Sequence, residues 1–254
     1  MKKVNTFNQF IAENIQQVQA QTQVQLNKDD IILNKVNKII DYTVIKPGTI
    51  KEKVKESIIE AIEFGYYGVV VEPELVDFCN FEIEDANLKT ISTLDFPSGE
   101  MKTTEKLNET IKIISDDADE IDMAIDIKEF KKAYLNDDIE TKNSSYLKIE
   151  NEIKEISDEC HKSGVLLKVV IESGLLSLEE LKDICNIVAN ANVDFIQTST
   201  GMKEIGAELS KVKEMRRLLP DYIKIKAAGG IRSIKDANAF YPFVDRIGTS
   251  VVLK

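Results

Sequence analysis

Histidine and cysteine, which often carry catalysis or bind metal ions, are scarce in this chain. His161 is the only histidine among 254 residues, and its charged surroundings predict a solvated position on a helix. A Ser-His-Asp triad is therefore excluded, because that chemistry needs a histidine beside the nucleophile. Cys79, Cys160 and Cys185 lie far apart and form no CxxC pair. We interpret them as structural thiols of a reducing compartment and expect neither a disulfide nor a metal site.

The charge of the chain and its lack of long apolar runs exclude two classes of partner. The sequence carries 33 Lys and Arg against 44 Asp and Glu, a net charge of −11, whereas nucleic acids and anionic membranes attract positive surfaces. No uncharged apolar run approaches the roughly 18 residues that a membrane span needs. Polar residues follow Met1 to Asn5, so no secretory signal is expected and a cytoplasmic location is predicted. A local basic pocket could still bind a small phosphorylated metabolite.

From about residue 36 the chain alternates between short β-rich runs and amphipathic helical stretches, which is typical of repeated βα units. Strands are predicted at 37–43, 68–72, 89–95, 119–125, 165–171, 193–197, 222–227 and 244–248. Helices are predicted from Ile50 to Phe64, from Thr103, after a cap at Ser177, and across 145–162. An apolar content of 43% suffices for one large core. We therefore expect a single α/β domain, a closed (β/α)8 TIM barrel, with an open doubly wound sheet as the alternative.

Both ends of the chain depart from a complete barrel. Residues 1–35 are expected to form an N-terminal helical extension, in which Phe7, Phe10 and Ile11 mark one helix face and a Gln-rich stretch occupies 16–27. Residues 36–254 are expected to form the barrel, but the chain stops at Lys254 without room for a final helix. We expect the N-terminal helix to cover the place of the missing one. Two other interpretations of the N-terminal segment stay open. It could be a flexible tether, or its helix could dock on a second chain, which would give a homodimer.

Charged and polar residues interrupt the predicted strands near their carboxyl ends. In a barrel every second strand residue points toward the axis, and the carboxyl ends of the strands form active sites. This inward polar set consists of Asp41, Thr43, Glu72, Asp122, Lys168, Glu172, Gln197 and Lys226. Buried charges are costly unless paired, so the set is either an ion-pair network that fills the barrel or an active site. We favour an active site, because glycine loops follow the same strand ends.

The last two predicted strands lead into glycines, hydroxyls and a cation. Gly229, Gly230 and Arg232 follow the seventh strand, and Gly248 and Ser250 lie at the end of the eighth. A lone Gly-Gly pair is a weak signal and often marks an ordinary turn. In barrels, however, the loops after the last two strands commonly hold phosphate through backbone N–H groups. The sequence therefore predicts a phosphate site for a small phosphorylated sugar or aldehyde.

Taken in order, these motifs resemble those of the deoxyribose-phosphate aldolases, class I enzymes that form an imine on a lysine. The matching segments are Asp41-Tyr42-Thr43 with Lys46-Pro47, Phe96-Pro97-Ser98-Gly99, Asp119 to Met123, Leu167 to Gly174, Thr198 to Met202, and the stretches around Lys226 and Gly248. The resemblance implies a (β/α)8 barrel that reversibly cleaves 2-deoxyribose 5-phosphate to glyceraldehyde 3-phosphate and acetaldehyde, without a metal or organic cofactor.

The resemblance also assigns roles to residues. It implies that Asp122 relays protons and that Lys226 is the second lysine of the site. Lys168, which belongs to the inward polar set, is a further catalytic candidate. The candidates for substrate binding are Asp41, Thr43, Glu72, Phe96, Thr198, Thr200 and Gly201. The phosphate segments coincide with the glycine loops described above.

One position departs from the family pattern at its chemical centre. Gln197 stands where the resemblance implies the imine-forming lysine, and an amide nitrogen is not nucleophilic. The change is not isolated. The second strand carries Val70 and Glu72 where the family commonly has Cys and Asn, and Val251 replaces a second serine after Ser250. We therefore expect lyase activity to be altered or lost.

Four explanations of this departure remain open. The substitution could be engineered, or the imine could have moved to Lys226 or Lys168. Alternatively, Asp122, Glu72 and Lys226 could serve a changed acid/base reaction on a phosphorylated sugar, or the barrel could bind its ligand without turnover. Glu72 is also expected to keep a lysine at position 197 protonated, so that Gln197→Lys alone would restore little activity.

Overall fold

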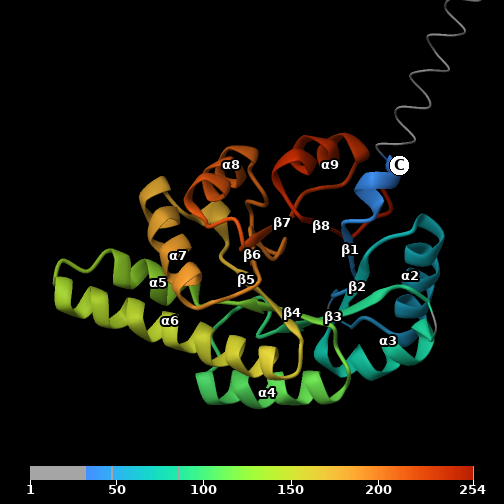
Figure 1. Cartoon of the computed structure of the whole chain (residues 1–254), viewed down its shortest axis with the longest axis horizontal. Coiled ribbons are helices and arrows are strands. Elements are labelled where there is room, and N and C mark those ends of the chain that lie inside the picture. Colours follow the sequence, from blue (N-terminus) through green and yellow to red (C-terminus); the bar gives the residue numbers. More distant parts are fainter. Residues whose placement is uncertain (1–32, 47, 85, 254) are drawn as a thin grey trace, which may run out of the picture.

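The computed structural model describes residues 33–46, 48–84 and 86–253, and within them eight parallel strands close into a barrel (Figure 1). The strands are β1 (Ile40–Thr43), β2 (Gly68–Val71), β3 (Lys89–Leu94), β4 (Glu120–Ala124), β5 (Leu166–Val170), β6 (Phe195–Gln197), β7 (Lys224–Ala228) and β8 (Arg246–Thr249). Each strand pairs with the next one along the chain, and β8 pairs with β1. The predicted closed barrel is therefore confirmed, and the open sheet is wrong.

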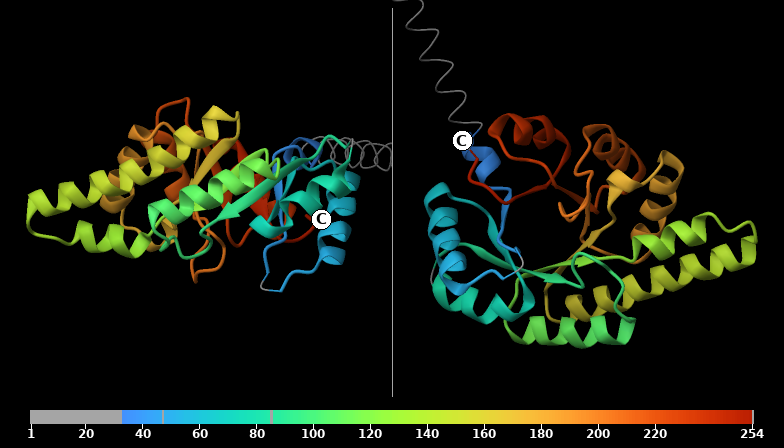
Figure 2. Two further views of the ribbon diagram at one scale, coloured as in Figure 1. Left: turned by 90° about the horizontal axis from the view of Figure 1, so that it is seen from below. Right: turned by 180° about the vertical axis from the view of Figure 1, so that it is seen from behind.

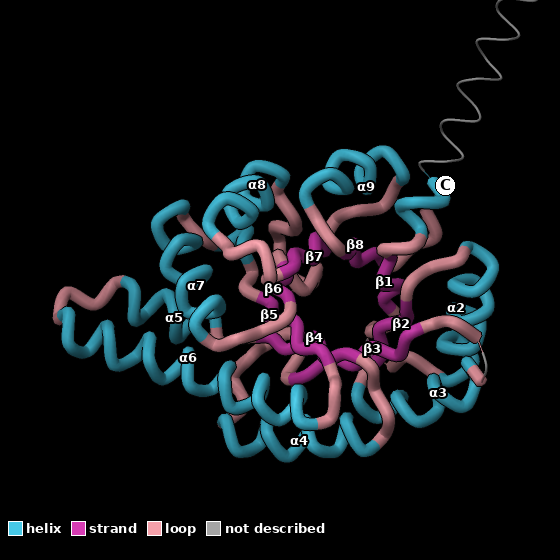
Figure 3. Tube along the Cα trace, viewed as in Figure 1, coloured by secondary structure: helices cyan, strands magenta, loops and turns pink. Residues whose placement is uncertain are grey.

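Helices surround the barrel and connect successive strands (Figure 3). They are α2 (Lys51–Phe64), α3 (Val76–Ile83), α4 (Thr103–Ser115), α5 (Ile127–Tyr134), α6 (Ile139–Lys162), α7 (Leu178–Asn190), α8 (Leu209–Leu218) and α9 (Ile234–Phe240). Three short 3-10 segments, η1 (Pro73–Leu75), η2 (Ser173–Leu175) and η3 (Tyr241–Phe243), lie between them. Both α5 and α6 connect β4 to β5, and together they extend outward from one side of the barrel (Figure 2).

Side-chain caps set the starts of α5, α6, α7 and α9, of which α7 and α6 test the predicted helix starts. The Ser177 hydroxyl accepts from the backbone N–H of Glu180, and the Glu180 carboxylate accepts from the N–H of Ser177, a capping box that starts α7 as predicted. The Asp138 carboxylate accepts from the N–H of Thr141, so α6 begins at Ile139 rather than at the predicted residue 145. The long charged helix is thus confirmed but begins earlier.

The first strand begins later than the sequence predicted. Residues 33–37 are helical, and β1 starts at Ile40 instead of residue 37. Asn37 is buried at the end of this helical turn, where its side-chain Nδ2 donates to the Phe64 carbonyl at 2.9 Å. This hydrogen bond ties the chain before β1 to the end of α2.

The alternation along the strands separates two layers of buried side chains. Ile121 and Met123 of β4 are fully buried in the apolar layer between strands and helices. Glu120 and Asp122 of the same strand alternate with them and face the barrel axis. The main apolar core therefore lies outside the sheet, whereas the charges lie inside it together with some apolar side chains such as Val70 of β2.

After β8, the described residues 250–253 contain no helix. The backbone N–H of Leu253 donates to the Tyr66 hydroxyl at 3.1 Å, and the Leu253 side chain is buried. The predicted cover over this place by the N-terminal helix falls on residues outside those described. Among the described helices, none combines the length and the apolar composition that crossing a lipid bilayer requires.

The packing of the outer layer can be tested at Phe130. Its ring is fully buried and stacks on Tyr146 with the centroids 5.5 Å apart, which joins α5 to α6. Phe130→Ala is expected to lower the free energy of unfolding by about 3–5 kcal/mol, because it leaves a cavity. Urea unfolding measures this loss. Phe81→Ala on α3, where the ring is 71% exposed, should change stability by less than about 0.5 kcal/mol. Equal effects in the two variants would contradict this packing.

Candidate active site

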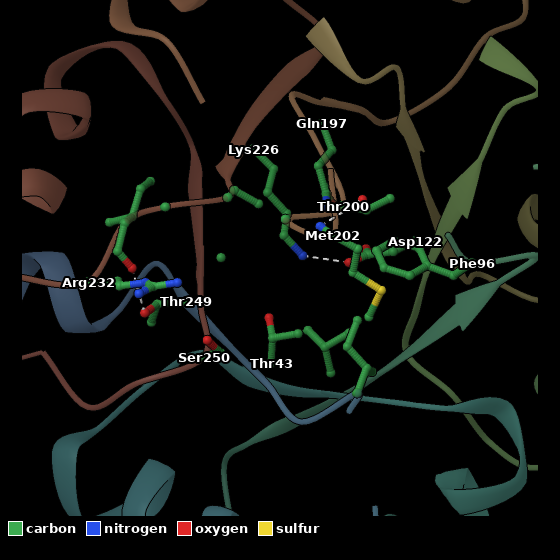
Figure 4. A pocket seen from close by; sticks show the side chains of 18 of the residues that line it. Thr43, Phe96, Asp122, Gln197, Thr200, Met202, Lys226, Arg232, Thr249 and Ser250 are labelled. Carbon is green, nitrogen blue, oxygen red and sulfur yellow. Dashed lines mark hydrogen bonds and ion pairs between the residues drawn. The ribbon is translucent and has the colours of Figure 1, made fainter. Parts of the chain in front are cut away.

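A cavity of about 260 Å³ opens at the carboxyl ends of the strands, where barrels place their active sites (Figure 4). Most of the residues that the sequence singled out line this cavity. They are Thr43, Phe96, Asp122, Gln197, Thr200, Gly201, Lys226, Gly229, Gly230, Arg232, Gly248 and Ser250. Apolar side chains, including those of Ile45, Val70 and Met202, form another part of the wall. The structure thus brings together residues from strands far apart in the sequence.

Asp122 lies on the floor of the cavity and bridges two lysines. Its Oδ2 lies 2.6 Å from Lys226 Nζ, and its Oδ1 lies 2.8 Å from Lys168 Nζ. Asp41 is the second partner of Lys226, at 2.7 Å. All four side chains are buried, but only Asp122 and Lys226 line the cavity. Lys168 and Asp41, which the sequence placed among the catalytic and substrate-binding candidates, lie beneath the floor and support it.

A deeper layer of charges continues below this floor. Glu120 lies 2.6 Å from Lys168 Nζ and accepts a hydrogen bond from the Tyr67 hydroxyl at 2.7 Å. The Arg246 guanidinium lies over the Tyr67 ring, 3.3 Å from its centroid, and 3.4 Å from Glu120 Oε1. The sequence did not lead us to propose Glu120, Tyr67 or Arg246 as site residues. Glu120 could have been found, because it lies two positions before Asp122 and therefore on the same inward face. The ion-pair network is thus continuous with the floor of the cavity.

The pKa values of these groups depend on the balance between burial and charge. Burial alone would raise the pKa of Asp122, but the Lys168 and Lys226 charges outweigh it and hold this pKa below its usual value. Burial would also raise the pKa of Glu120, but the Lys168 charge is the main effect that outweighs it and lowers this pKa. At Asp41 burial prevails and raises the pKa. The Asp122 and Glu120 carboxylates overcome burial to raise the pKa of Lys168. Lys168 is therefore held as an ammonium, which is not a nucleophile.

Gln197 ends β6 and lies beside Lys226 of β7 in the parallel register. It is 3% exposed, and its Nε2 donates to the Ser199 carbonyl at 3.0 Å. Because a carbonyl oxygen only accepts, this bond fixes which end of the amide carries the nitrogen. The other end, Oε1, is buried and accepts no hydrogen bond from the described residues. An unsatisfied acceptor of this kind costs about 1–3 kcal/mol.

Two polar residues expected near the substrate hold the backbone instead. The Thr198 hydroxyl donates to the Ala228 carbonyl and accepts from the Ala228 N–H, both at 2.9 Å, which ties the end of β6 to β7. Glu172, at a left-handed φ of 47°, accepts from the N–H and the hydroxyl of Thr200. Thr200 therefore reaches the cavity wall on a fixed loop. Thr198, predicted to bind the substrate, uses its side chain to bind the backbone of β7 and does not line the cavity.

Glycine is required where the seventh and eighth strands meet the cavity. A Cβ on Gly248 would lie 2.8 Å from the Ala228 Cβ, and one on Gly229, whose φ is 97°, would lie 2.7 Å from the Ser199 Oγ. The backbone therefore forms the cavity surface at these points. Arg232 is exposed at the rim, together with Lys46, which the sequence analysis did not propose as a site residue.

Glu72 lies away from the position that the sequence predicted for it. Strand β2 ends at Val71, and Glu72 is the residue before η1, whereas Val70 is the β2 side chain that lines the cavity. Burial, helped by the Glu74 charge, raises the pKa of Glu72. Since Glu72 does not line the cavity, the reason for expecting it to hold a lysine at position 197 protonated is lost.

The scarce histidine and cysteines lie outside the cavity. His161 is exposed on α6, with its Nε2 2.8 Å from Asp194 Oδ2, as expected for a surface residue. Cys79, Cys160 and Cys185 are buried and free of disulfides, and burial raises the pKa of Cys79 to about 11. Within the described part of the chain, no three His, Cys, Asp or Glu side chains are grouped as a metal site would need.

Fold and site together define a closed (β/α)8 barrel with a buried lysine–carboxylate group below a glycine-rich mouth. No family model matches the chain. The deoxyribose-phosphate aldolase of Treponema denticola is 35% identical over 216 residues, which covers 85% of this chain and 95% of the relative. The deoxyribose-phosphate aldolase of Caldanaerobacter subterraneus subsp. tengcongensis is 33% identical over 231 residues, with 90% and 95% covered.

A solved structure agrees with these sequence matches. The deoxyribose phosphate aldolase from Aeropyrum pernix, described as a unique tetrameric structure, has a TM-score of 0.75 and 26% identity, and the match covers 85% of this chain and 87% of that chain. This chain belongs to the deoxyribose-phosphate aldolase family.

The bridging role of Asp122 predicts a large and pH-dependent effect on stability. Asp122→Asn should lower the free energy of unfolding at pH 7 by about 3–5 kcal/mol, because it removes one charged partner from each of two buried lysines and leaves Asp41 and Glu120 as their remaining carboxylates. The folded-state pKa of Asp122 is depressed, so its contribution is present above the ordinary value of 3.8 and is lost as the pH falls through the folded-state pKa. The difference between the two proteins should therefore narrow below pH 3.8.

Chemical denaturation across this pH range measures the difference. The matched control is Glu56→Gln, which removes a surface ion pair with Lys53 whose side chains are 53% and 67% exposed, and should change stability by less than about 1 kcal/mol. The account would be contradicted if Asp122→Asn lowered the free energy of unfolding as little as the control does, or by an amount that does not change with pH. Either result would show that the Asp122 carboxylate is not a buried charged bridge.

Proposed function

We propose that this family member binds a small phosphorylated sugar or aldehyde in the barrel cavity and has lost the imine-dependent cleavage that the resemblance implies. The single observation that carries the proposal is Gln197, a neutral carboxamide beside Lys226 at the place where the resemblance puts the imine-forming lysine. Imine formation needs an unprotonated amine that attacks a carbonyl, and an amide nitrogen cannot do this.

The arrangement at the glycine-rich end supports phosphate binding. Gly229, Gly230 and Gly248 expose backbone at the cavity, while Arg232 and Lys46 add positive charge at the rim. Backbone N–H groups combined with cations at the carboxyl ends of the last two strands form a common phosphate site in barrels. A ligand held here by its phosphate would reach toward Gln197 and Lys226 across the same cavity.

Relocation of the imine to another lysine is the weaker alternative. Lys168 lies beneath the floor, does not line the cavity, and is held as an ammonium by Asp122 and Glu120. Lys226 does line the cavity, but its Nζ lies between Asp41 and Asp122 at 2.7 and 2.6 Å. The Nζ of Lys226 is therefore engaged by two carboxylates and is not free to approach a carbonyl in this arrangement.

An acid/base reaction on a phosphorylated sugar is also less favoured than binding alone. Asp122 would be its base, but both of its oxygens contact lysines and its pKa is depressed. A base works best when its pKa lies near the working pH, so a carboxylate of this kind is a poor proton acceptor. Glu72, the other acid/base candidate, does not line the cavity. We therefore retain binding without lyase turnover as the function.

The proposal also includes the cellular location of the protein, its cofactor requirement and its partners. We propose a cytoplasmic protein that uses no cofactor, and we expect neither a nucleic acid nor a membrane as partner, in keeping with the net charge of −11. The tetramer named for the Aeropyrum pernix aldolase makes association into a homo-oligomer, of which a homodimer is the simplest case, worth testing by gel filtration.

Chemical trapping tests the loss of imine chemistry. Incubation with acetaldehyde and borohydride, followed by intact-mass and peptide mass spectrometry, should give no site-specific adduct in the unmodified chain, because Gln197 cannot form an imine. The matched variant Gln197→Lys places an amine beside Lys226, whose charge disfavours a second ammonium next to it. That variant should therefore give an adduct at position 197. An adduct on Lys226 or Lys168 of the unmodified chain would contradict the proposal.

Phosphate binding is tested at Arg232. Calorimetric titration with 2-deoxyribose 5-phosphate should show at least tenfold weaker binding in Arg232→Ala, because a charge-assisted contact to the phosphate is removed. The control is Arg217→Ala on α8, where the arginine pairs with Glu214 and its side chain is 71% exposed away from the cavity lining. It should leave the affinity unchanged. Equal affinities in all three proteins would rule out Arg232 as a phosphate ligand.

A further inference from the structure

Gln197 and Lys226, two neighbouring residues that line the cavity, have hydrogen-bonding capacity that no described residue uses. Gln197 Oε1 is buried and accepts no hydrogen bond from any described residue. An ammonium has three N–H donors, and Lys226 Nζ donates to Asp122 Oδ2 and lies 2.7 Å from Asp41 Oδ2. At least one N–H of Lys226 is therefore left over. Gln197 and Lys226 are paired across β6 and β7, and Figure 4 shows their side chains next to each other at the cavity.

Only some ligand groups satisfy both atoms at once. A hydroxyl both donates and accepts, so it can give its hydrogen to Gln197 Oε1 and accept from Lys226 Nζ. A carbonyl oxygen accepts only, so it would satisfy Lys226 and leave the Gln197 oxygen without a partner. A site built to hydrogen-bond a hydroxyl discriminates strongly against an analogue that lacks it, because buried polar groups then remain unpaired.

We propose that Gln197 and Lys226 form a hydroxyl subsite, so that this chain selects a phosphorylated polyol, whose terminal carbon carries an alcohol where an aldolase substrate carries a carbonyl. The inference rests on the proposed function, because the phosphate must be held at the glycine-rich end for the alcohol to reach position 197. It adds to that function the chemical class of the ligand. No covalent step is involved, and Asp122 acts only by holding Lys226 in place.

The test compares two probes that differ in a single hydroxyl. They are 2-deoxyribitol 5-phosphate and the same compound without its C1 hydroxyl, each titrated calorimetrically into the unmodified chain. Removal of the hydroxyl should weaken binding about tenfold, the size expected for one hydrogen-bonded group in a buried site. Equal affinities for the two probes would overturn the inference, and this comparison needs no variant to fold.

Two variants identify the residues responsible. Gln197→Met has nearly the same size but lacks the acceptor, so its preference between the probes should fall well below tenfold, to the part that Lys226 alone provides. Arg232→Ala should weaken both probes equally and keep the tenfold preference, because it acts at the phosphate end. A tenfold preference that persists in Gln197→Met would place the hydroxyl elsewhere and overturn the assignment.

The outcomes also separate this inference from the function on which it rests. Binding of both probes with equal affinity, weakened by Arg232→Ala, would leave phosphate binding intact and overturn the hydroxyl subsite alone. Failure of both probes and of 2-deoxyribose 5-phosphate to bind the unmodified chain would overturn the proposed function and the inference together.

Discussion

The contact on which the interior of this barrel depends is the bridge that Asp122 forms between Lys168 and Lys226. Both lysines are buried, and a buried ammonium is tolerated only when charge and hydrogen bonds compensate the loss of water. Asp122 provides one oxygen to each of them, with Asp41 and Glu120 as their second partners. The bridge holds the strands β4, β5 and β7 in one electrostatic unit and fixes the floor of the cavity.

The charges of this unit explain how a glutamine can stand at position 197. The carboxylates of Asp41, Glu120 and Asp122 face the cations of Lys168, Lys226 and Arg246. The opposite charges are therefore equal in number without any contribution from position 197. A neutral amine there would keep this balance, and so does the neutral amide of Gln197. The barrel can consequently lose the nucleophile while the network that supports its floor remains intact.

The sequence predicted the barrel well because the relevant signals are local and periodic. Every predicted strand is present, and the alternation around Asp122 correctly separated the axial face from the apolar face. The glycine loops after β7 and β8 also shared one cavity, as expected of strand ends. Depth was harder to predict, because alternation gives the direction of a side chain but not its height along the axis. The alternation thus placed Lys168 on the axial face but could not show that it lies below the floor of the cavity.

Other failures have equally specific causes. The alternation of β2 predicted that the Glu72 side chain points toward the barrel axis. The strand ends at Val71, however, and the chain turns into η1 directly after Glu72. Thr198 was expected to contact the ligand, but its hydroxyl forms hydrogen bonds with the backbone of Ala228. These bonds join β6 to β7, and no sequence pattern reveals them. Arg246 was missed because its partners come from strands far away in the chain.

The central claim is that the cavity binds its ligand without forming a covalent bond to it. A crystal structure of the unmodified chain with 2-deoxyribose 5-phosphate tests this most directly, because it distinguishes a non-covalently bound ligand from a covalently attached one. The account predicts a phosphate at the glycine-rich end beside Arg232, with the sugar extending toward Gln197 and separated from every lysine. Electron density continuous between the sugar and the Nζ of Lys226 or Lys168 would contradict it.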